Sequence, residues 1–236
     1  MHVSLSEIQS TICKAALGVG LPLGLGEDAG WAARNMMTNG IGSISGFAEA
    51  LDAIEEGKST GFDADRAGAG YFTSKPAGFL LSAIWAAPST CDLVASTTSR
   101  NSKFSTITLI NVDVPSVILF EVLASTVDVP KGLCVAWNAG SNDEIEAVCW
   151  RGSLSLIKGM RKDLLLTAPA DITIQLVNQK PPDQSMDVYR CIQREAVEIH
   201  ASSWRRITIY ADRLLVDASD TSRLTGAGAG SIIELD

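Results

Sequence analysis

The spacing of apolar residues changes twice along this chain of 236 residues, and the changes restrict the folds that it can adopt. In residues 1–57 apolar positions recur every three or four residues, which is typical of amphipathic helices. Residues 100–178 instead hold short runs rich in Val, Ile, Thr and aromatic residues, which favour strands. From residue 195 to the end, a helix and a Gly-rich tail are predicted. Helices at both ends of a run of mostly antiparallel strands predict a single α+β domain over residues 1–236.

The first 57 residues are predicted to form three helices. Ser4 has the spacing of a capping box with a glutamate three residues later, so the first helix begins there. Pro22 can open the second helix because its missing N–H costs little in a first turn. The third helix is predicted over residues 45–56. Residues 58–76 are rich in Gly, Ser, Thr and Asp and are predicted to form a long loop, which is usually functional or disordered.

The middle of the chain is predicted to hold strands over residues 104–112, 117–124, 133–137, 144–150 and 171–177. Residues 115–126 fit a helix that starts at Pro115 equally well. The apolar runs 79–87 and 91–96 are too short to assign. Cys91 starts the second run and is the cysteine that could be exposed and reactive, but a buried or inert thiol is the favoured interpretation. A long final helix is predicted over residues 195–214.

Composition narrows the partners that we expect. The net charge of −8 argues against nucleic acid and against an anionic membrane surface. No apolar stretch reaches the roughly 20 residues that span a bilayer, and no signal peptide is recognisable, so a cytoplasmic protein is expected. Two histidines are too few for a multi-histidine metal site, and no motif for a nucleotide cofactor is present, so neither metal nor cofactor is expected.

The last fifteen residues contain a candidate anion site. Alternating glycines let the backbone approach a ligand closely, and successive N–H groups in such a segment can surround an anion. An arginine beside them could supply a fixed charge. The candidate residues are Ser222, Arg223, Gly226, Gly228 and Gly230. A flexible or edge-packing tail is the alternative interpretation.

Two further segments could contribute to the same site. Arg66 precedes a shorter Gly-Ala-Gly sequence and repeats the arrangement of the tail. In the second predicted helix, Glu27, Trp31 and Arg34 are spaced to share one face, so that a carboxylate, an aromatic ring and a guanidinium could line a pocket. A solvated helix face with an acidic first turn explains the same residues.

Two sets of residues near the ends of the chain resemble a known family pattern. The first is Ser4-Leu5-Ser6-Glu7-Ile8, Lys14-Ala15-Ala16, Gly18-x-Gly20-Leu21-Pro22 and Glu27-Asp28-Ala29-Gly30; the second is Ser222-Arg223-Leu224-x-Gly226-Ala227-Gly228-Ala229-Gly230. Together they resemble an uncharacterised bacterial family known only as a domain of unknown function. The chain differs from the family pattern at Gly26 and in the less polar residues 231–236. The resemblance supplies no reaction, but it implies that the Glu27 helix and the Gly-rich tail are defining features of the same family, which is consistent with a shared site.

We therefore expect a small-molecule enzyme or binding protein with a site for a carboxylate or phosphate. In this hypothesis Arg34, Arg66 and Arg223 hold the anionic group, and Glu27 acts as a base or as the anchor for a ligand amine. The residues do not decide between catalysis and binding. The alternative is a non-catalytic subunit, in which the Gly-rich tail packs between copies of the chain in a homo-oligomer.

Overall fold

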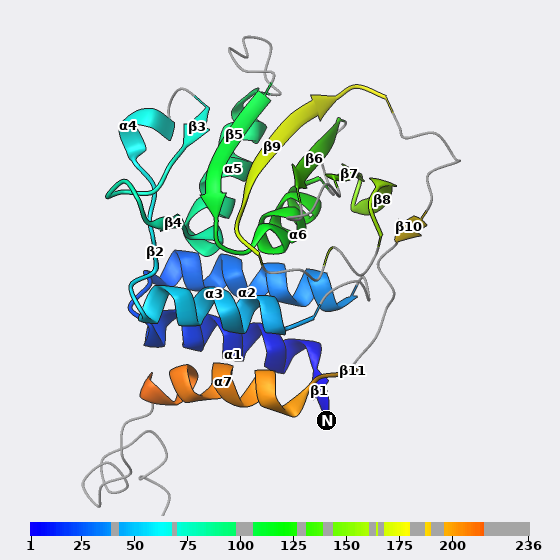
Figure 1. Cartoon of the computed structure of the whole chain (residues 1–236). Coiled ribbons are helices and arrows are strands. Elements are labelled where there is room, and N and C mark those ends of the chain that lie inside the picture. The colour runs from blue at the N-terminus through cyan, green and yellow to red at the C-terminus, as the bar shows by residue number, and fades with distance from the viewer. Residues whose placement is uncertain are drawn as a thin grey trace, which may run out of the picture.

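The computed structural model confirms an α+β protein in which helices pack against a mixed sheet (Figure 1). It describes residues 1–38, 43–67, 70–97, 106–126, 131–138, 144–160, 164, 168–179, 187–189 and 196–214. The helices are α1 (Leu5–Gly18), α2 (Leu23–Thr38), α3 (Ser45–Glu55), α4 (Ala64–Ala67), α5 (Ala83–Thr97), α6 (Pro115–Ser125) and α7 (Ala201–Ala211). The strands are β1 (His2–Ser4), β2 (Ser59–Thr60), β3 (Tyr71–Phe72), β4 (Leu80–Leu81), β5 (Thr106–Val112), β6 (Gly132–Asn138), β7 (Glu144–Trp150), β8 (Ser153–Lys158), β9 (Ala170–Val177), β10 (Asp187–Tyr189) and β11 (Ala196–Glu198).

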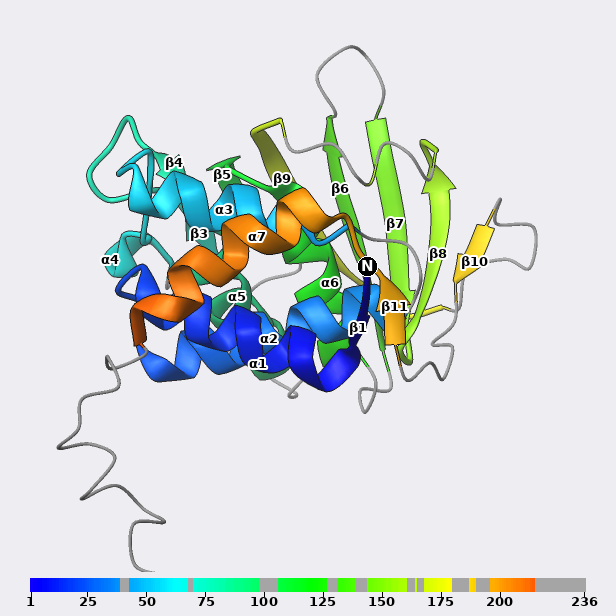
Figure 2. The ribbon, with the colours of Figure 1, turned by 90° about the horizontal axis from the view of Figure 1, so that it is seen from below.

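The three helices predicted near the N-terminus are present as α1, α2 and α3. The Ser4 hydroxyl accepts a hydrogen bond from the Glu7 amide at 3.1 Å, as the predicted cap requires. Helix α1 lies between α2 and α7, which approach it from opposite sides (Figures 1 and 2). Its apolar face is buried, and the residues that make up this face are Leu5, Ile8, Ile12, Ala15 and Ala16.

The large sheet combines a parallel part with an antiparallel part. Among the described residues its order is β10–β8–β7–β6–β9–β5–β4–β2, and β3 also pairs with β5. Strands β2, β4 and β5 run parallel, whereas every pairing from β5 to β10 is antiparallel. Along β9 the buried Ile172 and Ile174 alternate with exposed polar residues, which is typical of a strand with one face in the core.

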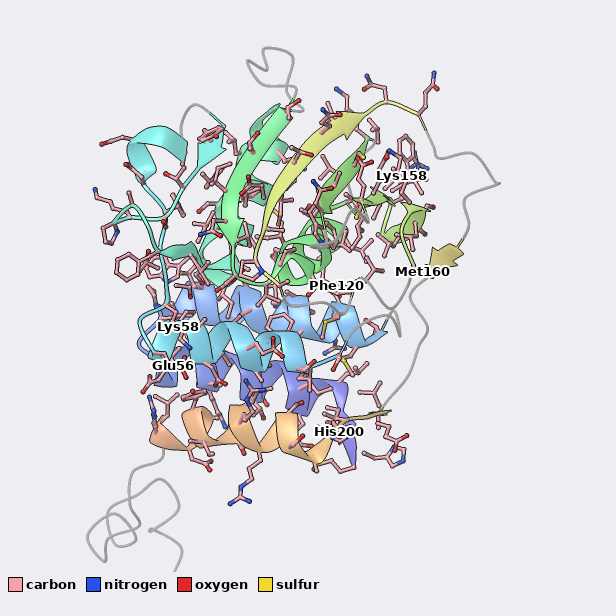
Figure 3. The ribbon with its side chains drawn as sticks, viewed as in Figure 1. Glu56, Lys58, Phe120, Lys158, Met160 and His200 are labelled. Atoms are coloured by element: carbon pink, nitrogen blue, oxygen red, sulfur yellow. The ribbon has the colours of Figure 1, made fainter. Side chains whose placement is uncertain are left out.

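Residues 117–124 are helical, so the strand predicted there is wrong and the alternative helix from Pro115 is confirmed. Helix α6 is apolar on almost every side because it is buried between the sheet and α2. Phe120 is fully buried where the two layers meet (Figure 3). A helix covered on all sides lacks the polar stripe that distinguishes it from a buried strand.

The first of the two short apolar runs is divided between strand β4 and the start of α5, and the second lies within α5, which contains Pro88. Cys91 therefore lies within a helix and is half-buried. Burial raises the pKa of its thiol, in agreement with the favoured interpretation of an inert cysteine. The predicted loop 58–76 also holds regular structure, since it contains β2, α4 and β3.

The C-terminal helix is shorter than predicted because residues 196–198 form strand β11. This strand pairs antiparallel with β1, and Val197 lies opposite Val3. Val197 and Ile199 are buried in alternation with exposed residues, so the local period is that of a strand. The pairing joins the two ends of the described chain, since the Ile199 amide also donates to the Met1 carbonyl at 2.8 Å.

Polar contacts attach α7 to the N-terminal helices. The Asp52 carboxylate of α3 accepts hydrogen bonds from the Arg206 guanidinium and, at 2.7 Å, from the Tyr210 hydroxyl. Arg213 binds both carboxylate oxygens of Glu55 at 2.8 Å. These contacts hold the C-terminal end of α7 beside α3, and Arg213 also donates to the Gly18 carbonyl at the end of α1 at 3.2 Å.

Candidate functional site

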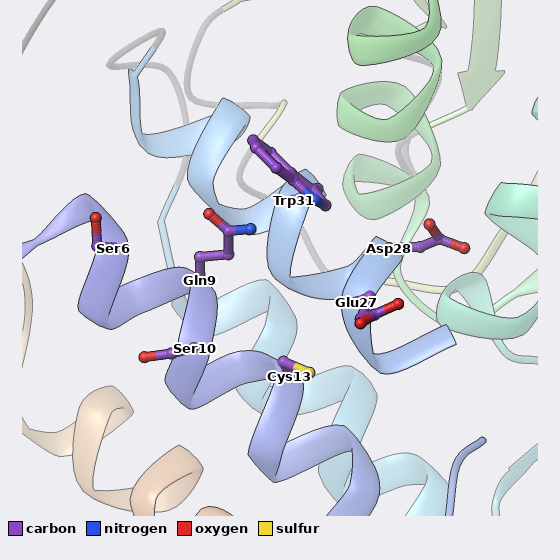
Figure 4. A pocket seen from close by; sticks show the side chains of 7 residues that line it. All are labelled: Ser6, Gln9, Ser10, Cys13, Glu27, Asp28 and Trp31. Atoms are coloured by element: carbon purple, nitrogen blue, oxygen red, sulfur yellow. The ribbon is translucent and has the colours of Figure 1, made fainter. Parts of the chain in front are cut away.

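A pocket of about 480 Å³ lies between α1 and α2 (Figure 4). Glycines in α2 allow the two helices to approach closely beside it. A Cβ atom on Gly30 would lie 2.6 Å from the Gln9 carbonyl oxygen, and one on Gly26 would lie 3.1 Å from the Cys13 carbonyl oxygen. The described residues that line the pocket are Ser6, Gln9, Ser10 and Cys13 from α1, and Glu27, Asp28 and Trp31 from α2.

The charged side chains in this lining are carboxylates. Glu27 is exposed and Asp28 is half-buried. Burial raises the pKa of Asp28, and the negative charges of Asp92 and Glu27 raise it further. Figure 4 shows the Asp28 side chain at the edge of the pocket, directed away from Gln9. The potential at this edge of the pocket is therefore negative, which favours a positively charged ligand group.

A third carboxyl group, Glu121 of α6, lies close enough to Asp28 to interact with its charge. Burial and the charge of Asp28 together raise the pKa of Glu121 to about 8, so this carboxyl group is largely protonated at neutral pH. The other carboxylate that lines the pocket, Glu27, is exposed.

The aromatic wall of the pocket is Trp31, whose side chain remains 50% exposed. The Arg34 guanidinium lies 5.6 Å from the centroid of the Trp31 ring. Arg34 also donates from Nη1 to the Gln9 Oε1 atom at 3.1 Å, which links α2 to α1 next to the pocket. A cation-binding ring and a guanidinium thus lie side by side along α2.

The Cys13 thiol of α1 lines the pocket and is a weak nucleophile. Burial raises its pKa, the Glu27 carboxylate raises it further, and Lys14 lowers it. A thiol that stays protonated is poorly reactive. Cys13 therefore lines the pocket as a thiol of low nucleophilicity.

The structure brings some of the predicted site residues together and leaves others undescribed. Glu27 lines the pocket, and Arg34 contacts two of its lining residues. Arg66 belongs to α4, which packs beside β3, and its side chain lies outside the described residues (Figure 1). The remaining candidates also lie outside them: Ser222, Arg223, Gly226, Gly228 and Gly230.

Sequence reasoning missed the contribution of α1. Ser6, Gln9, Ser10 and Cys13 line the pocket, and they recur every three or four residues opposite the apolar face. This polar stripe can be recognised from the spacing of the residues. It does not by itself indicate a pocket, because a solvent-exposed helix face has the same composition.

Two further properties of the described residues limit the chemistry. No group of three or more His, Cys, Asp or Glu side chains in the described part is arranged to hold a metal ion. No helix within the described ranges has the length and apolar character needed to cross a bilayer.

The fold and the pocket define an α+β protein with an acidic, aromatic-walled recess between two N-terminal helices. A family model described as a protein of unknown function (DUF3726) matches residues 3–73, and the predicted resemblance to a family of unknown function is thereby confirmed. The matched segment contains every described residue that lines the pocket. Comparison with curated proteins and with solved structures finds no significant match.

Proposed function

We propose that the α1/α2 pocket binds a small molecule that carries an ammonium group. The observation that supports this proposal is the combination of two carboxylates, Glu27 and Asp28, with the half-exposed Trp31 ring in one recess. Carboxylates attract an ammonium group by charge, and an indole face attracts it through its π electrons. The volume of about 480 Å³ is of the size that holds a small metabolite.

The ligand would carry an acidic group as well. Arg34 lies next to the ammonium subsite, and a guanidinium can bind a carboxylate or phosphate through two parallel hydrogen bonds. Arg66 and the Gly-rich tail with Arg223 remain predicted contributors to this second subsite. An amino acid or another small zwitterion satisfies both subsites.

Thermal unfolding with candidate ligands tests the proposal. Amino acids and short diamines are compared with simple carboxylates and with inorganic phosphate. A true ligand at one hundred times its Kd stabilises the fold by about 2.7 kcal/mol, and Tm should rise accordingly. If none of the amine-containing compounds raises Tm while carboxylates alone do, the ammonium subsite is refuted.

Variants assign the binding to this pocket. Glu27→Gln should weaken binding of an amine ligand by roughly tenfold or more, because a hydrogen bond to a charged group contributes about 1.5–3 kcal/mol. Glu7→Gln is the matched control, since Glu7 is an exposed α1 carboxylate that does not line the pocket. Equal affinities of both variants would place the site elsewhere.

Deletion of residues 222–236 separates the two functional hypotheses from the sequence. Loss of ligand binding with an unchanged molecular mass in solution would support a tail that completes the site. A changed oligomeric state with unchanged binding would support the alternative of a packing element between subunits.

A further inference from the structure

Gln9 of α1 lines the pocket, and its side chain contacts α2 at two points. Its Oε1 atom accepts the hydrogen bond from Arg34 Nη1 at 3.1 Å. Nearer the backbone, the Gln9 Cγ atom lies 3.3 Å from the position of a Cβ atom on Gly30. The residue is half-buried, and these contacts hold its side chain between the two helices.

The hydrogen bond with Arg34 determines the orientation of the Gln9 amide. A guanidinium has donors and no acceptor, so the amide oxygen of Gln9 has to face it. The amide nitrogen then points to the other side. Figure 4 shows this nitrogen on the side of Trp31 and Asp28, both of which line the pocket. Gln9 therefore presents N–H donors to the pocket and its acceptor to Arg34.

The Arg34 guanidinium brings a positive charge to the same place. Its contacts with the Gln9 amide and the Trp31 ring are contacts with uncharged groups. None of the ion pairs between described residues includes Arg34. The recess therefore combines carboxylates that attract an ammonium group with donors and a charge that attract a carboxylate.

The position of Gln9 along α2 suits a ligand that contacts both kinds of group. Glu27 and Arg34 are seven residues apart, which is about 10 Å along a helix axis. Gln9 packs against α2 between them, at Gly30. A ligand whose ammonium group binds Glu27 and which extends toward Arg34 therefore passes the Gln9 amide. A carboxylate on such a ligand meets N–H donors there.

We propose that Gln9 determines the ligand class of this pocket: its Nε2 atom donates a hydrogen bond to a carboxylate of the ligand and so selects amino acids over amines that lack this carboxylate. The inference rests on the ammonium subsite proposed above. Arg34 is a positioning residue, because it fixes the amide orientation and polarises the amide through Oε1. A second ammonium group in place of the carboxylate would face N–H donors and a positive charge.

Pairs of ligands that differ only in the carboxylate test this selection. The probes are alanine with ethylamine, phenylalanine with phenethylamine, and lysine with cadaverine, and each Kd is measured by isothermal titration calorimetry. The wild-type protein should bind the amino acid of at least one pair more tightly, by roughly tenfold or more, since the amine lacks the charged acceptor. Gln9→Met removes the donor without a change of charge and should reduce this preference by roughly tenfold.

Gln9→Glu provides a second measurement with nearly the same side-chain size. The introduced carboxylate would pair with Arg34 and repel a ligand carboxylate, so the amine should bind as tightly as the amino acid or more tightly. Lys14→Gln is the control, because it changes the net charge by the same amount at an exposed α1 position that does not line the pocket. It should keep the wild-type preference. If the Gln9→Met protein does not fold, the comparison of Gln9→Glu with Lys14→Gln decides.

The outcomes separate the role of Gln9 from the proposed function. An amino-acid preference that the Gln9 variant leaves unchanged would overturn the role of Gln9, and the ammonium subsite would stand. Equal affinity of the wild-type protein for both members of every pair would overturn the selection in the same way. If neither amines nor amino acids bind, the ammonium subsite itself is refuted, and the role of Gln9 with it.

Discussion

The buried carboxylate of Asp113 should make the stability of this protein depend on pH in a direction opposite to that of most carboxylates. Burial raises its pKa from 3.8 to about 6, even though the Ala83 and Val114 amides and the nearby Ser59 hydroxyl lower it. Because the pKa in the folded protein is the higher one, the folded state holds the proton more tightly between these two values. The free energy of unfolding should therefore fall as the pH rises through this window.

The magnitude follows from the difference of the two pKa values. One pKa unit corresponds to about 1.36 kcal/mol, so ionisation of Asp113 should cost the fold about 3 kcal/mol in total. Between about pH 4.5 and pH 7.5 the contribution changes by about 2 kcal/mol. The carboxyl group is almost fully buried, so solvent screening does not reduce this figure appreciably.

Asp113→Asn isolates this contribution. The amide oxygen of asparagine can still accept from both backbone amides, and the side chain no longer titrates. Urea unfolding is followed by circular dichroism for both proteins across this pH range. The difference in unfolding free energy, variant minus wild type, should increase by about 2 kcal/mol from the acidic to the neutral end.

The comparison needs a control for net charge. Asp65→Asn removes one negative charge at an exposed position of α4, and its effect is subtracted from that of Asp113→Asn. A corrected difference that stays constant with pH would show that Asp113 does not change its protonation state between folded and unfolded protein. A difference that decreases toward neutral pH would show that the helix amides outweigh burial, and the reasoning would be refuted.

Three further predictions concern the helical layer. Gly30→Ala should destabilise the protein by about 1–3 kcal/mol in thermal unfolding, since the added Cβ would collide with the backbone of Gln9. Gly24→Ala in the same helix should stabilise the protein by up to about 1 kcal/mol, because the space around its Cβ is open. Tyr210→Phe should cost about 1 kcal/mol in urea unfolding, because it removes the hydroxyl that donates to α3; an unchanged midpoint would contradict this. Glu27→Gln should speed alkylation of Cys13 at mildly alkaline pH, because loss of the Glu27 charge lowers the pKa of the thiol. The rate is measured by peptide mass spectrometry, and an unchanged rate would contradict an electrostatic interaction between Glu27 and Cys13.

Much of the fold could be predicted because the periodicity is strong wherever an element has one buried face. Helices α1, α2 and α3 each bury a stripe and expose the rest, and β9 alternates in the same way. The prediction was ambiguous or wrong where that contrast is absent. Helix α6 is covered on all sides, and β11 is too short to separate its alternation from the helix that follows.

The site could be predicted only in part because it depends on how two helices pack. The spacing of Glu27, Trp31 and Arg34 indicates a shared face of α2, but it does not reveal which element lies opposite. That partner is α1, and its position depends on the close approach at Gly30. No pattern within a single helix contains this information, because the crossing point is a property of both helices.

The arrangement of the layers explains why a ligand pocket would lie between helices and not at the sheet. In open α/β sheets, ligands bind beyond the carboxyl ends of parallel strands, near helix N-termini. Here Asp113 already satisfies the amides at the starts of α5 and α6, and the residue is buried beneath the N-terminal helices. The position where a ligand usually binds in such sheets is therefore occupied by the Asp113 side chain. The segment matched by the family model, residues 3–73, supplies both these covering helices and the pocket between α1 and α2, so that the same 71 residues cover the strand ends and form the recess for which we propose a ligand.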